Sequence, residues 1–184
     1  MNSNFCMNCG QALEDREIGG EVRRACPECS FVHWGNYSVG VGALVMKDNK
    51  LLLVRRMHDP GKGKWTNPGG FIEQHETIES TIVREVMEET GVTVKVNRII
   101  GLGDKPGSVH HTYITFVMDY VSGEPKADGI EVDKAGFYSI EEMKELNVAD
   151  FTWRLAQLVI NDNHQGFQLN EKINAPANGY RLWR

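Results

Sequence analysis

All four cysteines of this chain fall within its first 29 residues, and this clustering constrains what the N-terminal segment can fold into. They form two Cys-x2-Cys pairs, with sixteen residues between the pairs: Cys6 with Cys9, and Cys26 with Cys29. Such pairs predict two tight turns that present four thiolates tetrahedrally to one Zn²⁺ ion. A segment this short buries too little apolar surface to fold alone, so the metal would supply much of its folding free energy. We therefore predict a structural zinc site with no open coordination position.

The alternative to zinc is two disulfides, which a reducing cytosol disfavours. The start "MNSNFCMNCG" lacks the charged and apolar segments of a secretory signal. No stretch approaches the eighteen or so continuous apolar residues that cross a bilayer. These features predict a cytoplasmic protein that does not enter membranes. The net charge of -5 argues against a general attraction to nucleic acids or anionic membranes. His33, close to the cysteines, is expected to be a packing or linker residue.

The pattern changes after the cysteine segment. Alternating, β-branched segments predict five strands, at residues 37–47, 50–57, 93–103, 110–121 and 134–139. Helical periodicity and capping residues predict three helices, at residues 77–90, 139–146 and 150–162. This order predicts a mixed sheet with helices packed on it, an α/β or α+β fold rather than a doubly wound one. We expect two domains, a small zinc ribbon at residues 1–33 and a larger domain at residues 34–184.

The helix at residues 77–90 has recognisable ends. Thr77 is a suitable N-cap, and Gly91 is placed to end the helix in a left-handed conformation. On a helical wheel the apolar residues sweep out one broad face: Ile78, Ile82, Val83, Val86 and Met87. We therefore expect this helix to lie against the sheet.

Three glutamates, Glu85, Glu88 and Glu89, group along the edge of that apolar face, where like charges repel one another. A charged run is ordinarily a solvated surface. Here the tight turn "NPGG", ending at Gly70, and the nearby Arg84 favour a different interpretation. Clustered carboxylates and a backbone carbonyl provide the hard oxygen ligands that suit Mg²⁺ or Mn²⁺.

The spacing of these residues resembles the signature of the Nudix hydrolases: Gly70, five residues, Glu76, seven residues, then "REVMEETGV". The likeness extends over roughly residues 37–161, and the cysteine segment resembles the zinc ribbon of one branch, which includes NADH, FAD and ADP-ribose pyrophosphatases. The resemblance implies an α/β/α sandwich with a mixed sheet, preceded by the ribbon. It also implies hydrolysis of a nucleoside diphosphate linked to another moiety. The chain lacks the SQPWPFP-type motif of the NADH branch, so ADP-ribose and FAD are favoured.

Carried over by position, the resemblance also implies roles for individual residues. Glu85 and Glu89 would be the principal metal ligands, Glu88 a further ligand or a water-bound group, and the Gly70 carbonyl another. Glu76 and Arg84 would be structural, orienting the loop and the carboxylates. The residues themselves agree, because hydrolysis of a pyrophosphate requires cations that neutralise charge and orient the attacking water.

Further candidates lie outside the signature. Glu131, in "DGIEVDK", resembles the distal glutamate that many family members use as a base; its alternative is an ordinary loop acid. Arg55, Arg56, Lys62 and Lys64 could meet substrate phosphates, or could simply be solvated. Trp65 could stack on a base, or could pack its own loop.

Other functions also fit parts of the sequence. One is a ligand-sensing or nucleic-acid-binding regulator, which would commonly lose some of the carboxylates that are all present here. Another is a Nudix enzyme acting on mRNA caps or oxidised nucleotides. The aromatic residues Phe167, Tyr180 and Trp183 in the C-terminal tail could fold back on their own domain or pack across a two-fold axis. The resemblance favours the second arrangement, a homodimer.

Overall fold

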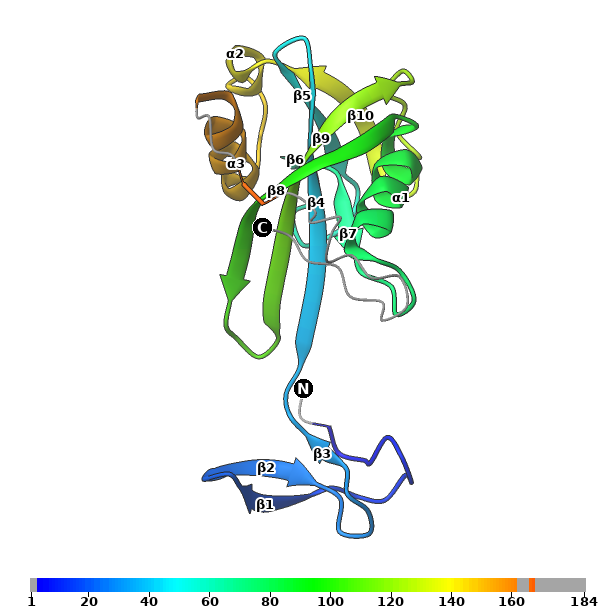
Figure 1. Cartoon of the computed structure of the whole chain (residues 1–184), viewed down its shortest axis with the longest axis vertical. Helices are drawn as coiled ribbons and strands as arrows, with labels where there is room; N and C mark the ends of the chain where they lie inside the picture. The colour runs from blue at the N-terminus through cyan, green and yellow to red at the C-terminus, as the bar shows by residue number, and fades with distance from the viewer. Residues whose placement is uncertain (1–2, 162–165, 168–184) are drawn as a thin grey trace. The chain divides into compact units, whose positions relative to one another are not determined.

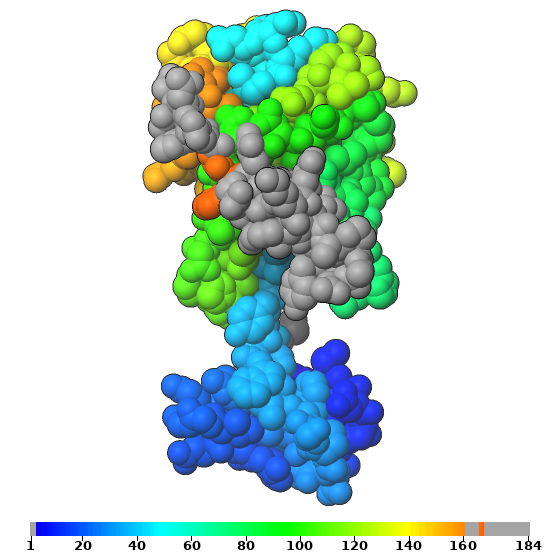
Figure 2. Space-filling model, viewed as in Figure 1, coloured from blue at the N-terminus to red at the C-terminus, as the bar shows by residue number. Residues whose placement is uncertain are grey.

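The computed structural model describes residues 3–161 and 166–167, which are the coloured parts of Figures 1 and 2. The chain divides into two compact units. The smaller contains residues 1–38 and 104–111, and the larger contains residues 39–103 and 112–184.

The smaller unit contains a three-stranded sheet in the order β1-β2-β3. Its strands are β1 (Glu14–Ile18), β2 (Glu21–Ala25) and β3 (Val32–His33), and each is antiparallel to its neighbour. A small core lies beside it, in which Cys6 and Cys26 pack with Leu13. So small a core agrees with the expectation that this segment needs a further source of stability.

A second sheet has the strand order β10-β5-β4-β9-β8, with the short strands β6 and β7 paired to β5 and β4 (Figure 1). The longer strands are β4 (Tyr37–Lys47), β5 (Lys50–Arg56), β8 (Thr93–Lys105), β9 (His110–Ser122) and β10 (Val132–Tyr138). The short strands are β6 (Trp65–Thr66) and β7 (Gly69–Phe71). Asp48 and Asn49 join β4 to β5 with positive φ angles of 49° and 60°, as a two-residue hairpin turn requires.

Helices cover both faces of this sheet, as the alternation of residues along the central strands shows. Val41, Ala43 and Val45 of β4 pack in one core with helix α1 (Ile78–Thr90). Leu44, between them, packs in a second core with α2 (Ile140–Met143) and α3 (Asp150–Asn161). Successive side chains of a strand point to opposite faces, so α1 lies on one side of the sheet and α2 and α3 on the other (Figure 1). This is the expected three-layer α/β/α sandwich.

All five predicted strands are present; three differ from the prediction by one or two residues at one end, and β10 differs at both ends. The helix predicted at residues 139–146 is shorter than expected, because only Ile140–Met143 is helical. In the described part of the chain, no helix is long and apolar enough to cross a membrane. Phe167 pairs through its backbone with Ile99 of β8, at 2.8 Å in both directions, so this residue folds back on its own chain. Tyr180 and Trp183 lie outside the described residues.

Candidate functional site

Helix α1 carries most of the candidate residues, and its ends are those predicted. The Thr77 side chain accepts a hydrogen bond from the Ser80 backbone N–H at 3.1 Å, and Gly91 ends the helix with φ 67°. The orientation of the helix differs from the prediction. Glu85 and Glu89 lie on its buried face, whereas Met87, expected on the apolar face, is 43% exposed. The glutamates are therefore not all along the edge of that face.

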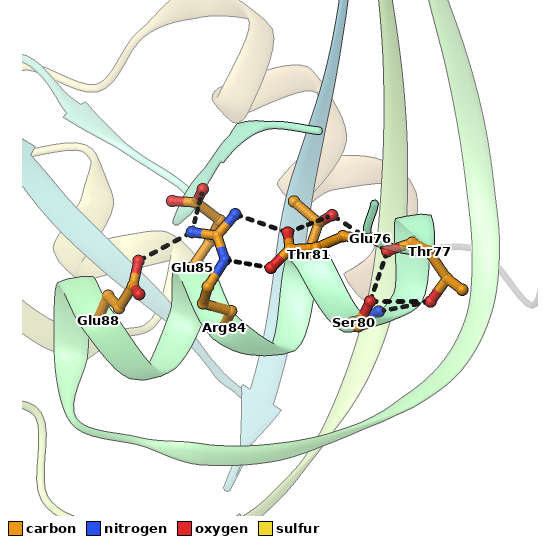
Figure 3. Close-up of polar contacts among 7 residues, drawn as sticks. All are labelled: Glu76, Thr77, Ser80, Thr81, Arg84, Glu85 and Glu88. Carbon is orange, nitrogen blue, oxygen red and sulfur yellow. Dashed lines mark hydrogen bonds and ion pairs between the residues drawn. The ribbon is translucent and has the colours of Figure 1, made fainter. Parts of the chain in front are cut away.

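Arg84 connects three of the acidic side chains (Figure 3). Its guanidinium donates two hydrogen bonds of 2.9 Å to Glu76 and one of 2.9 Å each to Glu85 and Glu88. Arg84 is the main reason that the pKa of the Glu76 carboxyl falls below its usual value. The Glu76 side chain also accepts a bond from the Thr81 hydroxyl at 3.0 Å. Arg84 and Glu76 thus form a hydrogen-bonded pair that holds the side chains of Glu85 and Glu88 in position.

Glu85 and Glu89 are buried, and both carboxyl groups have a raised pKa. For Glu89 the pKa rises to about 8, because burial disfavours its charge, while the backbone N–H of Gly69 donates a hydrogen bond to it at 3.0 Å and opposes the rise. Burial also raises the pKa of Glu85, and Arg84 opposes this. The negative charges of neighbouring carboxylates add to both shifts. Two buried carboxylates that resist ionisation need a nearby cation before they can both be charged.

Strand β7 brings the backbone of the "NPGG" turn against these carboxylates. A Cβ atom on Gly70 would lie 2.4 Å from the Glu85 carboxylate, so only glycine permits this close approach. The arrangement fits a hard divalent cation, because carboxylate oxygens and peptide backbone converge there. Among the described residues, the four cysteines are the only group of three or more His, Cys, Asp or Glu side chains whose ligand atoms all lie within 4.8 Å of one another, so the glutamate cluster is more open. Glu88, ion-paired with Arg84, is exposed, whereas Glu85 and Glu89 are buried.

Glu131 lies in the loop before β10, and its charge contributes to the raised pKa of both Glu85 and Glu89. A set of hydrogen bonds that the sequence did not predict holds this loop in place. The Asp128 carboxylate accepts hydrogen bonds from the backbone N–H groups of Ile130, Glu131 and Val132, at 3.0 to 3.1 Å. The Glu131 carbonyl in turn accepts a bond of 2.8 Å from Met57. Glu131 is therefore an exposed acid on a well-anchored loop.

Of the two adjacent arginines on β5, Arg56 is the one whose charge reaches the carboxylates. Arg55 forms an ion pair with Asp133 through two nitrogens, one of them at 2.7 Å. Arg56 lowers the pKa of Glu89 through its charge, and its side chain donates to the Pro60 carbonyl at 3.0 Å. Lys64 is exposed on the loop that follows. Adjacent side chains of a strand point to opposite faces of the sheet, so Arg55 and Arg56 have different neighbours.

Trp65 is only 6% exposed and packs edge-on against Tyr138, with ring centroids 4.9 Å apart. This burial agrees with packing, the alternative to base stacking that the sequence left open for Trp65. A nearby buried polar network was not predicted: Asn67 donates to the Tyr113 hydroxyl at 3.2 Å and accepts from the Thr152 hydroxyl at 2.9 Å. The pKa of Tyr113 is raised to about 12, mainly by burial. This network fixes the start of the "NPGG" turn, and Asn67 itself was the only sequence signal for it.

The four cysteines of the smaller unit converge as predicted. Their sulfur atoms all lie within 4.8 Å of one another, with Cys6–Cys29 and Cys9–Cys26 distances of 3.5 Å. Four thiolates around one zinc at about 2.3 Å would be about 3.8 Å apart. The Asn8 backbone N–H points at the Cys6 sulfur, at 3.4 Å, and such a donor favours a thiolate. The donor set and its spacing therefore fit zinc.

Comparison with known proteins places this geometry in a family. The NUDIX domain family matches residues 36–159, which include the whole run from Gly70 to Val92. The chain belongs to the Nudix family. A crystal structure of a NUDIX hydrolase from Nitrosomonas europaea superposes with a TM-score of 0.78 and 26% sequence identity, covering 89% of this chain and 94% of that one.

Two curated Nudix relatives carry functional names. An ADP-ribose pyrophosphatase from Methanocaldococcus jannaschii is 38% identical over 112 residues, which is 59% of this chain and 66% of the archaeal protein. An NAD-capped RNA hydrolase, NudC, from Pseudomonas aeruginosa is 30% identical over 145 residues, which is 79% of this chain. The chain spans only 51% of the length of that NudC.

Proposed function

We propose that this chain is a metal-dependent Nudix pyrophosphohydrolase that cleaves the pyrophosphate bond of a nucleoside diphosphate linked to another moiety. The observation that carries the proposal is the buried pair Glu85 and Glu89, held between Arg84 on their own helix and the Gly69–Gly70 backbone. Burying two carboxylates beside each other is costly unless a cation accompanies them. A polyanionic substrate would need that same cation.

In this proposal Glu85, Glu89 and the Gly70 carbonyl hold Mg²⁺ or Mn²⁺, and Glu88 contributes from the exposed side of the helix. The bound cations would neutralise the pyrophosphate and lower the pKa of the attacking water. Arg84 and Glu76 position the carboxylates through the hydrogen bonds described above. Glu131 is the proposed base, because its loop is anchored and its charge is felt by both buried glutamates. Arg56 is placed to meet a substrate phosphate.

Cys6, Cys9, Cys26 and Cys29 are proposed to hold one Zn²⁺ ion that takes no part in the reaction. Four thiolates fill the tetrahedral coordination of zinc and leave no position for water or substrate. The metal would instead stabilise the small sheet β1-β2-β3. Its contribution would be large, because that unit has only a few buried apolar residues.

ADP-ribose is the proposed substrate, with FAD next. The name of the archaeal relative supports ADP-ribose, and the chain has no SQPWPFP-type motif that would favour NADH. A second candidate is an NAD group, free or at the end of an RNA. The NudC match favours this second candidate, because its 145 aligned residues exceed the Nudix domain span of residues 36–159. Both candidates contain a pyrophosphate between two nucleoside or sugar groups, so the same metal site would serve either.

The test is to incubate the protein with ADP-ribose, FAD, NADH or a short NAD-capped RNA, and to separate the products by chromatography. With Mg²⁺ or Mn²⁺, ADP-ribose should give AMP and ribose 5-phosphate at the highest rate. Faster cleavage of NAD-capped RNA would select the second candidate. A protein that binds these compounds and cleaves none of them would instead support a ligand-sensing regulator.

A further inference from the structure

The smaller unit contains a pocket that the proposed hydrolysis does not use. Its volume is about 430 Å³, within the range of small-molecule binding sites. Residues of the small sheet, of the segment that follows it and of the turn between β8 and β9 line the pocket, among them Arg23, Arg24, His33, Trp34 and Tyr37. The lining is mainly polar and basic, in a chain whose net charge is -5. A basic hollow in an acidic protein points to an anionic ligand.

Arg23 is the cation in this pocket that has capacity for a ligand. Its Nε atom is buried and has no hydrogen-bond partner among the described residues. Its register partner across the β1–β2 hairpin is Arg16, whose charge is already paired with Glu14 at 2.7 Å. Arg24, by contrast, already bonds to the Asp15 carboxylate and the Leu13 carbonyl. An anion held by the guanidinium of Arg23 would supply the counter-charge that Asp15 supplies to Arg24.

One aromatic ring lies beside this arginine, and a second lines the same pocket. The Arg23 guanidinium lies 4.9 Å from the ring centroid of Trp34, and Trp34 is 59% exposed. Tyr37, also in the pocket lining, is 66% exposed, and its ring lies 5.8 Å from that of His110 with a tilt of 31°. Exposed rings next to an arginine are the combination on which nucleic-acid bases stack while the phosphate meets the cation.

We propose that this pocket binds a nucleotide, with its base on the exposed aromatic rings of Trp34 and Tyr37 and its phosphate on Arg23. The ligand is either a free mononucleotide or one nucleotide of a single-stranded RNA, because the two share this chemistry. Every lining residue belongs to the smaller unit, whereas the carboxylate cluster belongs to the larger one. The pocket is therefore a second site, independent of the proposed hydrolysis.

The test follows the indole N–H signal of Trp34 in ¹H–¹⁵N spectra of the full chain, assigned from its loss in Trp34→Phe. AMP, a 5′-phosphorylated hexaribonucleotide and inorganic phosphate are titrated separately, without added Mg²⁺ or Mn²⁺. AMP should shift the signal and saturate it. Affinity, measured for every variant by isothermal titration calorimetry, should fall about tenfold or more in Arg23→Ala and in Trp34→Ala, since a charge-assisted contact is lost in the first and stacking in the second. Arg23→Lys keeps the charge without the planar fork and should lose less.

The matched control is Arg16→Ala, which removes the same charge from the register partner of Arg23 but does not line the pocket. Its affinity should stay within about twofold of the unaltered chain, since the Arg16 charge is exposed, paired with Glu14 and outside the pocket lining. Tighter binding of the hexaribonucleotide would identify RNA as the ligand, and equal binding would identify a free nucleotide. The proposal is overturned if AMP leaves the Trp34 signal in place, or if phosphate alone binds as well as AMP. Neither result would bear on hydrolysis, which is measured separately.

Discussion

At the scale of single residues, Glu89 shows most clearly the conflict between folding and function. A carboxyl group in this position would be replaced by an apolar residue if only packing mattered, because it is 4% exposed and points among buried groups. The chain provides one backbone donor, the N–H of Gly69, and a second acid, Glu85, that makes ionisation harder still. Such an arrangement is expected where a charge must be ready for a cation.

The first prediction concerns the pH dependence of stability in protein without Mg²⁺ or Mn²⁺. The folded-state pKa of Glu89 is about 8, against an ordinary value of 4.5. Between these values the folded chain holds a proton that the unfolded chain has lost, so the free energy of unfolding should fall as pH rises from about 4.5 to about 8. The change should be a few kcal/mol, and Glu89→Gln should remove most of it.

Urea unfolding at pH 5 and at pH 8, followed by circular dichroism, measures this difference. Glu145→Gln is the control, because it removes an exposed carboxylate outside the cluster. Adding Mg²⁺ at pH 8 should restore stability to the unaltered chain and not to Glu89→Gln. Equal pH profiles for the unaltered chain and Glu89→Gln would mean that the carboxyl group ionises freely in the folded state.

At the scale of helices and strands, features set by residues close in the sequence were predictable, whereas pairings between residues distant in the sequence were not. The ends of α1 depend on Thr77 and Gly91 alone, and both were predicted correctly. The strands β6 and β7 are only two and three residues long and include the adjacent glycines of "NPGG", so they carry no periodicity to detect. The pairing of Arg55 with Asp133 joins residues 78 positions apart, which no pattern along the chain reveals.

The orientation of α1 shows why a helical wheel can place residues of a functional site on the wrong face. The wheel assigns charged residues to the margin of the apolar face, and so it placed Met87 inside and the glutamates at the edge. In the structure, Glu85 and Glu89 occupy the buried face and Met87 is partly exposed. A hydrophobicity scale measures the free-energy cost of burying a side chain that has no partner. It does not include the stabilisation that a bound cation would give to a buried carboxylate.

At the scale of the whole molecule, two units of different size depend on different sources of stability. The larger has two extended apolar cores, one on each face of its sheet. The smaller has a few buried residues around Cys6 and Cys26, and its integrity should depend on the metal. Loss of the zinc should therefore affect one unit and leave the chemistry of the other intact.

The second prediction is that Cys26→Ser loses the zinc, which should be one ion per chain in unaltered protein purified without chelator. Residues 3–33 should then become sensitive to protease, because their folding free energy comes largely from the metal. Hydrolysis by the larger unit should change little. Met7→Ser alters an 82% exposed side chain in the same turn without removing a thiolate, so it should keep the zinc. Metal analysis that finds no zinc in the unaltered protein would refute the site.

The central claim, that the glutamates of α1 hold the cations of a pyrophosphohydrolase, is tested most directly by one rate. This is the Mg²⁺-dependent release of AMP from ADP-ribose, or from the best substrate of the panel, by Glu89→Gln and by the control Glu145→Gln. The amide introduced by Glu89→Gln can still accept the Gly69 hydrogen bond, so folding should persist while turnover falls by orders of magnitude, as expected when a transition-state contact is lost. Glu145→Gln should retain the unaltered rate. An undiminished, equally Mg²⁺-dependent rate in Glu89→Gln would contradict the account.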